Sequence, residues 1–225
     1  VKRGALADFS SVRPSGLIAI SLDEGDELGW VRLTGGKDEI IMVTREGQAL
    51  RIPESEIRSM GRPAAGVAGI KLKTGDRLTS MDVIETGGQL LTVTEHGFGK
   101  RSDLKEYPVK GRATGGVATI DQKQLPRVGH ITAARVVQAE DEVTLISSAG
   151  VILRLKVKDI SMSGRATRGF KLMDLGDEDV VVSVARINTS EISKTEGENI
   201  APVNGLVETP DEETDAEKSD SPAEA

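Results

Sequence analysis

The feature that most constrains this chain is a cassette that repeats about every 50 residues along most of its length. Each cassette has a short apolar run, a turn that ends in Gly, and an Arg four residues after that Gly. The turns end at Gly47, Gly97 and Gly150, and the corresponding arginines are Arg51, Arg101 and Arg154. Repetition at this period predicts an array of similar units that stack on one another.

Two further landmarks recur at fixed offsets after each Arg. Six residues beyond it stands a bulky apolar residue preceded by an acid, as in Glu56-Ile57, and a Gly-Arg segment follows. The other acid pairs are Asp8-Phe9, Glu106-Tyr107 and Asp159-Ile160, and the Gly-Arg segments are 61–66, 111–116, 164–169 and a shortened form at 13–16. Because Val1 to Gly4 match the middle of a cassette, we expect a fragment with three complete repeats and one partial repeat, divided near residues 38, 89 and 142.

The period within each repeat is that of short strands. Each repeat offers four β-branched runs separated by Gly-containing turns. They are 40–44, 49–52, 66–72 and 78–84, then 90–94, 98–102, 116–120 and 131–137, then 143–147, 151–155, 169–173 and 180–187. Four strands per repeat is the size of a propeller blade, and one blade cannot bury both faces, so neighbouring blades must stack. We therefore predict an all-β, propeller-like array over residues 1–190.

The charge of the chain is unevenly distributed. The net charge is −7, but residues 191–225 hold 11 acids and two Lys, so residues 1–190 are slightly basic. We expect this acidic tail to be disordered, because it has too few large apolar residues to offset its ordering entropy. Two interpretations of the tail stay open, a solubilising extension and a phosphate mimic that competes for a basic surface.

Composition excludes several classes of protein. The chain has no Cys, which rules out disulfides and thiolate metal sites and fits a reducing cytoplasm. No apolar run approaches the roughly 20 residues of a membrane span. His96 and His130 have no carboxylate cluster between them, and no set of nucleophile, base and orienting group is visible. We expect no catalytic, cofactor-binding or metal-binding residue in this chain.

In combination these landmarks resemble the blades of the gyrase A C-terminal domain family, which belongs to the type II topoisomerases. The resemblance rests on the Gly-x-x-x-Arg hairpins, the Gly-Arg segments, the Leu-x-x-Gly-Asp-x-Leu stretch at 72–78, and the opening residues 8–20 and 23–28. It implies a six-bladed β-pinwheel whose basic outer edge wraps duplex DNA, so that an ATP-driven enzyme, DNA gyrase, can introduce negative supercoils.

The resemblance also implies what lies elsewhere. The catalytic Tyr, ATP and Mg²⁺ are expected outside this chain, in upstream regions of the gyrase A polypeptide and in the ATPase B subunit of a heterotetramer. The expected location is the bacterial cytoplasm, at the nucleoid. The Gln-Arg-Arg-Gly-Gly-Lys-Gly-like box of the family is absent, and Gly111 to Gly116 is only related to it. The alternatives are the corresponding domain of topoisomerase IV and a kelch-like propeller that binds proteins.

Cations repeated at one position per blade suit wrapping without a sequence code, because phosphate contacts supply affinity but little sequence information. The first group of candidate DNA-binding residues lies in the Gly-Arg segments, where Gly lets backbone N–H groups approach phosphate. It comprises Arg13, Arg62, Arg112, Arg165 and Arg168. The second group lies on the hairpins and comprises Lys2, Arg3, Arg51, Lys100, Arg101 and Arg154. For the first group the alternative roles are capping of carbonyls and pairing with an Asp or Glu of the adjacent blade. For the second group the alternative is an ion pair with Glu56, Glu106 or Asp159.

Overall fold

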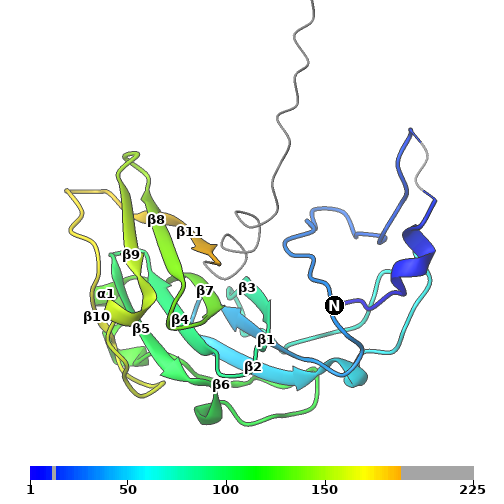
Figure 1. Cartoon of the computed structure of the whole chain (residues 1–225), viewed down its shortest axis with the longest axis horizontal. Coiled ribbons are helices and arrows are strands. Elements are labelled where there is room, and N and C mark those ends of the chain that lie inside the picture. Colours follow the sequence, from blue (N-terminus) through cyan, green and yellow to red (C-terminus); the bar gives the residue numbers. More distant parts are fainter. Residues whose placement is uncertain (12–13, 189–225) are drawn as a thin grey trace, which may run out of the picture.

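The computed structural model describes residues 1–11 and 14–188. Three antiparallel sheets stand side by side in an arc (Figure 1), with strand orders β3-β1-β2-β6, β10-β5-β4-β7 and β11-β8-β9. The first sheet uses β1 (Glu39–Thr44), β2 (Gln48–Pro53), β3 (Leu78–Val83) and β6 (Val117–Ala118); the second uses β4 (Gln89–Thr94), β5 (Phe98–Asp103), β7 (Ile131–Val137) and β10 (Phe170–Lys171); the third uses β8 (Glu142–Ser147), β9 (Ile152–Lys156) and β11 (Val181–Ile187). The prediction of an all-β fold is confirmed.

Helical structure is confined to short turns. The 3-10 helices are η1 (Leu6–Phe9), η2 (Glu54–Glu56), η3 (Leu104–Glu106), η4 (Gln122–Gln124) and η5 (Val157–Asp159), and the α-helix is α1 (Leu125–Val128). Within the described residues, no helix has the length and apolar character needed to cross a membrane. The predicted tail, residues 191–225, and Arg13 lie outside the described residues.

Each of the first two sheets is completed by a strand from the following repeat. β6 belongs to the third repeat in sequence but pairs with β2, with Gln48 opposite Ala118. In the same way β10 pairs with β5, with Phe170 opposite Gly99. The third sheet has three strands among the described residues. Adjacent repeats are therefore joined by backbone hydrogen bonds as well as by packing.

Two parts of the strand prediction are wrong. Residues 66–72 form no strand; they make one isolated bridge, between Ile70 and Thr114, and a backbone pair between Val67 and Val1. The third strands at 117–118 and 170–171 are also shorter than predicted. The reason is that these segments pair across repeats, where a twisted neighbour offers only a few aligned backbone groups.

The turn glycines make room for the exchanged strand. Gly97 has φ +78°, and a Cβ at this position would lie 2.4 Å from the carbonyl oxygen of Met173 in the next repeat. At Gly47 a Cβ would lie 2.3 Å from Ile120 Cγ2. Gly150 has a similar φ of +84°, but no described atom lies within 4 Å of its Cβ position. The turn therefore needs Gly for conformation in all three repeats, and for space in two of them.

This difference predicts a graded stability effect. Gly150→Ala should lower the free energy of unfolding by about 1–2 kcal/mol, the usual cost of a left-handed residue with a side chain. Gly97→Ala should lower it by about 2–3 kcal/mol more, because the backbone of Met173 must move. Chemical denaturation of both variants measures the difference. Equal losses would show that the exchanged strand does not press on the turn.

The core lies between neighbouring sheets. Ile41 and Val43 of β1 pack with Leu90 of β4 and Val136 of β7 in one buried cluster. In the three complete repeats, the apolar residue that follows the landmark acid is buried in this core: Ile57, Tyr107 and Ile160 are 4%, 1% and 2% exposed. Tyr107, predicted to be a core residue, is buried with its hydroxyl 2.5 Å from Thr119 Oγ1, and burial raises the pKa of its phenol.

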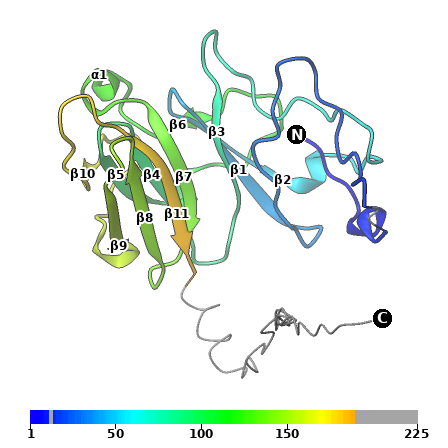
Figure 2. The same ribbon diagram turned by 90° about the horizontal axis from the view of Figure 1, so that it is seen from above.

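Ion pairs link the sheets at their inner strands, where β7 packs against both β3 and β11 (Figure 2). Arg135 Nε of β7 lies 3.0 Å from Asp82 Oδ2 of β3. Arg186 Nε of β11 lies 2.6 Å from Asp141 Oδ2, and its guanidinium also pairs with Glu85. The inner strands of neighbouring sheets are therefore joined by ion pairs, and the opposite edge of the array faces outward.

Candidate nucleic-acid interface

Three segments run along the outer edge of the array, and together we call them the outer rim: residues 57–73, 107–120 and 160–173. They contain the Gly-Arg segments and the outermost strands β6 and β10. They hold four, two and three Lys or Arg residues respectively and no Asp or Glu, in a chain with more acids than bases. The three segments are therefore net positive, which is the electrostatic footprint of a polyanion site. Two acids border them: Glu56 lines a small pocket with Arg58 and Arg112, and Glu106 accepts from the backbone N–H of Arg165.

Several rim cations are exposed and unpaired. Among the described residues, none forms a hydrogen bond or ion pair with the charged groups of Arg58, Lys71, Lys73 and Arg168. Lys171 is also exposed, with its Nζ 3.0 Å from Asp174 Oδ1. Five rim cations were not predicted from the repeated landmarks: Arg58, Lys71, Lys73, Lys110 and Lys171. The absence of acids from these three segments was the signal that could have identified them.

The arginines of the Gly-Arg segments lie on the rim and touch the preceding repeat. Arg165 Nη1 donates a hydrogen bond to the carbonyl of Ala118 at 2.7 Å, and Arg112 Nη1 lies 3.4 Å from the carbonyl of Ala68. Arg112 is exposed, and Arg165 and Arg62 are half-buried. One N–H of Arg112 and one of Arg165 therefore caps a carbonyl, and the remaining donors of each guanidinium have no partner among the described residues.

Two hairpin arginines, Arg51 and Arg101, occupy a different environment, between the repeats, whereas Arg154 is exposed. Arg101 is only 8% exposed, and its Nε and Nη2 donate to the carbonyls of Ile160 (2.6 Å) and Lys158 (3.1 Å) in the next repeat. Arg51 Nη1 likewise donates to the carbonyl of Leu104 at 2.8 Å. Burial lowers the pKa of Arg101. These guanidinium groups therefore donate to carbonyls in η3, in η5 and directly after η5, and the carbonyl of Leu104 also accepts from the backbone N–H of Tyr107.

The acidic partners of the hairpin arginines differ from those expected. Arg51 Nε lies 2.7 Å from Glu39 Oε2, Arg154 pairs with Glu142, and Arg3 Nη1 lies 3.7 Å from Glu54 Oε2. The alternative pairing with Glu56, Glu106 or Asp159 is therefore wrong for these arginines. Glu106 instead accepts a hydrogen bond from the backbone N–H of Arg165 at 2.8 Å.

The hairpin lysines point beneath the Gly-Arg segments. Lys100 is buried, and Lys2 is half-buried. Each ammonium group donates to backbone carbonyls of the Gly-Arg segment in the next repeat, at Gly164 and Arg165 for Lys100 and at Arg62 for Lys2. The structure therefore places the described cations of the Gly-Arg segments on the outer rim and most hairpin cations between the repeats, while Arg154 pairs with Glu142 on its own exposed hairpin. DNA contact by either set stays a prediction.

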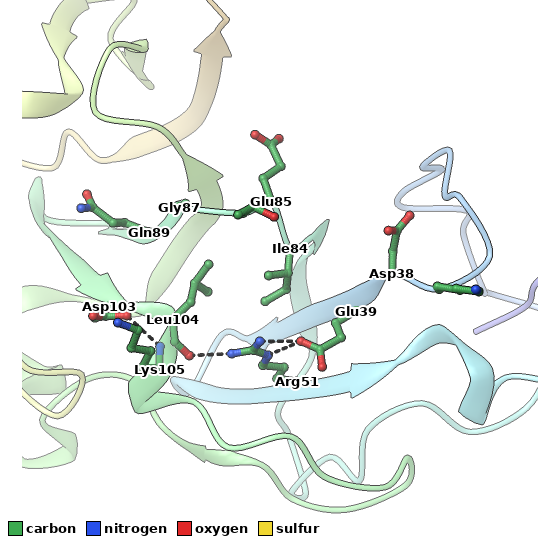
Figure 3. A pocket seen from close by; sticks show the side chains of 13 residues that line it. Asp38, Glu39, Arg51, Ile84, Glu85, Gly87, Gln89, Asp103, Leu104 and Lys105 are labelled. Carbon is green, nitrogen blue, oxygen red and sulfur yellow. Dashed lines mark hydrogen bonds and ion pairs between the residues drawn. The ribbon is translucent and has the colours of Figure 1, made fainter.

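A groove of about 500 Å³ opens between the first two sheets, away from the outer rim (Figure 3). Its lining contains four carboxylates and three cations: Asp38, Glu39, Glu85 and Asp103 with Lys37, Arg51 and Lys105. Figure 3 shows the guanidinium of Arg51 held between Glu39 and the carbonyl of Leu104. Because acids outnumber bases and Arg51 is already paired, this groove is poorly suited to a phosphate.

A protein-family model matches this chain in four segments that coincide with the repeats. The family model described as "DNA gyrase C-terminal domain, beta-propeller" matches residues 1–34, 38–85, 88–138 and 141–188. The chain belongs to this family. The family prediction made from the repeated landmarks is thus confirmed, together with the propeller-like fold.

Two curated gyrase A proteins are similar over 88% of this chain. One, from Halalkalibacterium halodurans, is 55% identical over 199 residues, and one, from Staphylococcus aureus strain MRSA252, is 40% identical over 198 residues. The aligned regions cover 24% and 22% of these relatives, so the chain spans about a quarter of their length. Both relatives come from bacteria.

Solved structures of the same family have the same arrangement of sheets. A C-terminal domain of DNA topoisomerase IV superposes with a TM-score of 0.80 at 30% identity, covering 88% of this chain and 63% of that one. A DNA gyrase A C-terminal domain superposes with a TM-score of 0.71 at 27% identity, covering 77% of this chain and 59% of that one. The chain is therefore similar in structure to a C-terminal domain of each enzyme, gyrase and topoisomerase IV.

Proposed function

We propose that this chain is the part of a gyrase A protein that binds duplex DNA along the outer rim. The observation that carries the proposal is the segregation of charge, with cations in all three outer segments and no acid in any of them. Cations on a convex edge meet successive phosphates of a bent duplex and release counterions, which gives affinity without sequence preference. Wrapping of this kind allows an ATP-dependent type II topoisomerase to introduce negative supercoils.

The proposal assigns different roles to the two sets of cations. Exposed rim residues such as Arg58, Arg112 and Arg168 contact phosphates directly. Hairpin residues such as Arg51 and Arg101 act mainly by holding neighbouring repeats together, because their donors already bind carbonyls of the next repeat. A loss of rim residues should weaken DNA binding at unchanged stability, and a loss of hairpin residues should first lower stability.

The remaining parts of the reaction are assigned to other regions. In this proposal the catalytic Tyr, ATP and Mg²⁺ belong to upstream regions of the gyrase A polypeptide and to the B subunit of the enzyme. These parts assemble with this domain into a heterotetramer in the bacterial cytoplasm, at the nucleoid. The chain supplies no catalytic group and no cofactor ligand of its own. Its similarity to a topoisomerase IV domain supports that enzyme as the second candidate.

The experiment that tests the proposal is equilibrium binding to linear duplex DNA at several salt concentrations. If about five rim cations contact phosphates, the logarithm of the association constant should fall with the logarithm of salt with a slope of about −4 to −5. A version that ends at Asn188 should bind more tightly, because it lacks the net charge of −9 carried by residues 191–225. Absence of binding by both versions at low salt would overturn the proposal.

The two candidate enzymes are separated by DNA topology. Nicked plasmid ligated in the presence of the chain should acquire a linking difference if the domain wraps DNA with a fixed handedness. Binding that leaves the linking number unchanged would favour the topoisomerase IV assignment over the gyrase assignment.

A further inference from the structure

Lys100 is a buried lysine whose three donors are all used. It lies on β5, is 2% exposed, and sits beneath the Gly-Arg segment 164–169 of the next repeat. Its Nζ donates to the carbonyls of Gly164 at 2.7 Å and Arg165 at 2.6 Å, and to Thr167 Oγ1 at 3.1 Å. A lysine is rarely buried without a carboxylate partner, so a role in packing alone does not explain this residue.

These hydrogen bonds hold the backbone of Arg165 on the side that faces β5. Its carbonyl accepts from Lys100, its N–H donates to Glu106 Oε2 at 2.8 Å, and its Nη1 donates to the carbonyl of Ala118 at 2.7 Å. Because the carbonyls of the segment turn inward toward the ammonium group, the guanidinium is held at the surface. The arginine is thereby pre-organised, which reduces the entropy lost when it binds a ligand.

The same arrangement recurs in the first repeat but not in the second. Lys2 Nζ donates to the carbonyl of Ala19 at 2.6 Å and to the carbonyl of Arg62. Both lysines stand immediately before a hairpin arginine, and the residue in the corresponding place of the second repeat is Leu50, which is fully buried. The Gly-Arg segment of the repeat after Leu50, residues 111–116, contains Ala113 at φ +59° and has no ammonium group from this position beneath it.

We propose that Lys100 and Lys2 are positioning residues for DNA binding: each holds the carbonyls of a Gly-Arg segment under the rim and so presents the arginine of that segment to a DNA phosphate. This inference rests on the proposed function, because it deepens the role of the outer rim. It assigns to two of the hairpin cations an indirect role in place of direct phosphate contact.

The protonation of Lys100 gives the inference a distinctive pH dependence. Burial lowers the pKa of Lys100 to about 8 from 10.5, Glu106 on η3 opposes this, and Arg165 adds to it. Thr92, which lies opposite Lys100 on β4, does not titrate. Loss of the proton removes one of three N–H donors, so one oxygen of the segment loses its partner. DNA affinity should therefore fall as the pH rises through about 8.

Stability should move in the opposite direction over the same range. Between about 8 and 10.5 the unfolded chain keeps the proton on Lys100 while the folded chain has lost it. Since the unfolded state then binds more protons, the contribution of this group to the free energy of unfolding rises with pH. A residue with a merely structural role would not lower DNA affinity while stability increases.

The test compares Lys100→Met with Leu50→Met, which changes the corresponding buried position in a repeat without the lysine. Binding to a short linear duplex is measured at constant ionic strength at pH values below and above 8. We expect Lys100→Met to bind about fivefold more weakly at the lower pH, the loss expected for charge-assisted hydrogen bonds that position one contact. It should also show a smaller decrease in affinity with pH than the wild-type chain and Leu50→Met. The amino group of Val1, whose pKa is lowered from 8.0 by burial, titrates in all three proteins and cancels in the comparison.

A second measurement needs no DNA. Amide hydrogen exchange in residues 164–169 should be faster in Lys100→Met and unchanged in Leu50→Met. If Lys100→Met does not fold, Lys2→Met with residues 61–66 gives the same test. If the wild-type chain binds duplex DNA but the lysine variants show unchanged DNA affinity and unchanged amide exchange, the inference is overturned and the proposed function stands. Failure of the wild-type chain to bind duplex DNA at low salt would overturn the proposed function and the inference with it.

Discussion

The combined variant Arg58→Gln, Arg112→Gln and Arg168→Gln is expected to bind duplex DNA on the order of a hundredfold more weakly at moderate salt. All three side chains are exposed on the outer rim, and no described carboxylate pairs with them. Each lost phosphate contact should also make the salt dependence shallower, by about 2.7 in the slope for three contacts. Fluorescence anisotropy with a labelled duplex at several salt concentrations measures both quantities.

The matched control removes the same charge from exposed residues outside the outer rim, as Lys37→Gln, Lys105→Gln and Arg127→Gln. This control should change affinity only slightly, because its cations are not on the surface that meets the phosphates. Both triple variants should unfold at the same denaturant concentration as the wild-type chain, since surface substitutions of this kind are nearly neutral. Equal losses of affinity in the two variants would show that net charge, and not the rim, determines binding.

The second large effect concerns stability. Arg186→Met should lower the free energy of unfolding by about 3–5 kcal/mol, because it leaves a buried carboxylate without its cation. The carboxylate is that of Asp141, which is 2% exposed and lies 2.6 Å from Arg186 Nε. Arg186 also pairs with Glu85 and donates to the carbonyl of Val136 at 3.0 Å, so its loss removes one of the hydrogen bonds between β11 and β7. Urea denaturation measures the change.

The dependence of the free energy of unfolding on pH in the acid range tests whether the ion pairs of Arg186 cause this loss. Hydrogen bonding to Arg186 holds the pKa of Glu85 below 4.5. A carboxyl with a lowered pKa contributes stability above its usual pKa and loses it as the pH falls, so the wild-type chain should lose stability more steeply in acid than Arg186→Met. Arg154→Met, which removes an exposed pair with Glu142, should cost less than about 1 kcal/mol. A similar cost for Arg186→Met would contradict the role of the inner ion pairs.

The sequence predicted the strands that pair within a repeat, and it overestimated the length of those that pair between repeats. β7 covers residues 131–137 as predicted, because β-branched residues and flanking turns define both its ends. The run at 66–72 contains two glycines and forms no ladder; it makes a backbone pair with Val1 and an isolated bridge from Ile70 to Thr114. Local composition indicates that a segment is extended, but pairing depends on a partner in another repeat.

The structure shows where the candidate DNA-binding residues lie, and their contact with DNA stays a prediction. The Gly-Arg segments do lie on the outside, but Lys100 and Arg101 are buried although their sequence context is as polar as that of exposed cations. Arg51 and Arg154 each lie 12 residues after their acidic partners, Glu39 and Glu142, which places each pair diagonally across one hairpin. That spacing was visible in the sequence, and it is the spacing expected for a diagonal side-chain pair across a hairpin.

The measurement that tests the central claim most directly is chemical footprinting of lysines with and without bound duplex DNA. Acetylation is slowed wherever DNA covers an ammonium group, so it maps the contact surface without any substitution. The lysines of the outer rim, Lys71, Lys73, Lys110 and Lys171, should be protected. Four exposed lysines outside the rim serve as controls and should react at unchanged rates: Lys37, Lys105, Lys123 and Lys156. Protection of the second set with unchanged reactivity of the first would contradict the assignment of the outer rim as the DNA-binding surface.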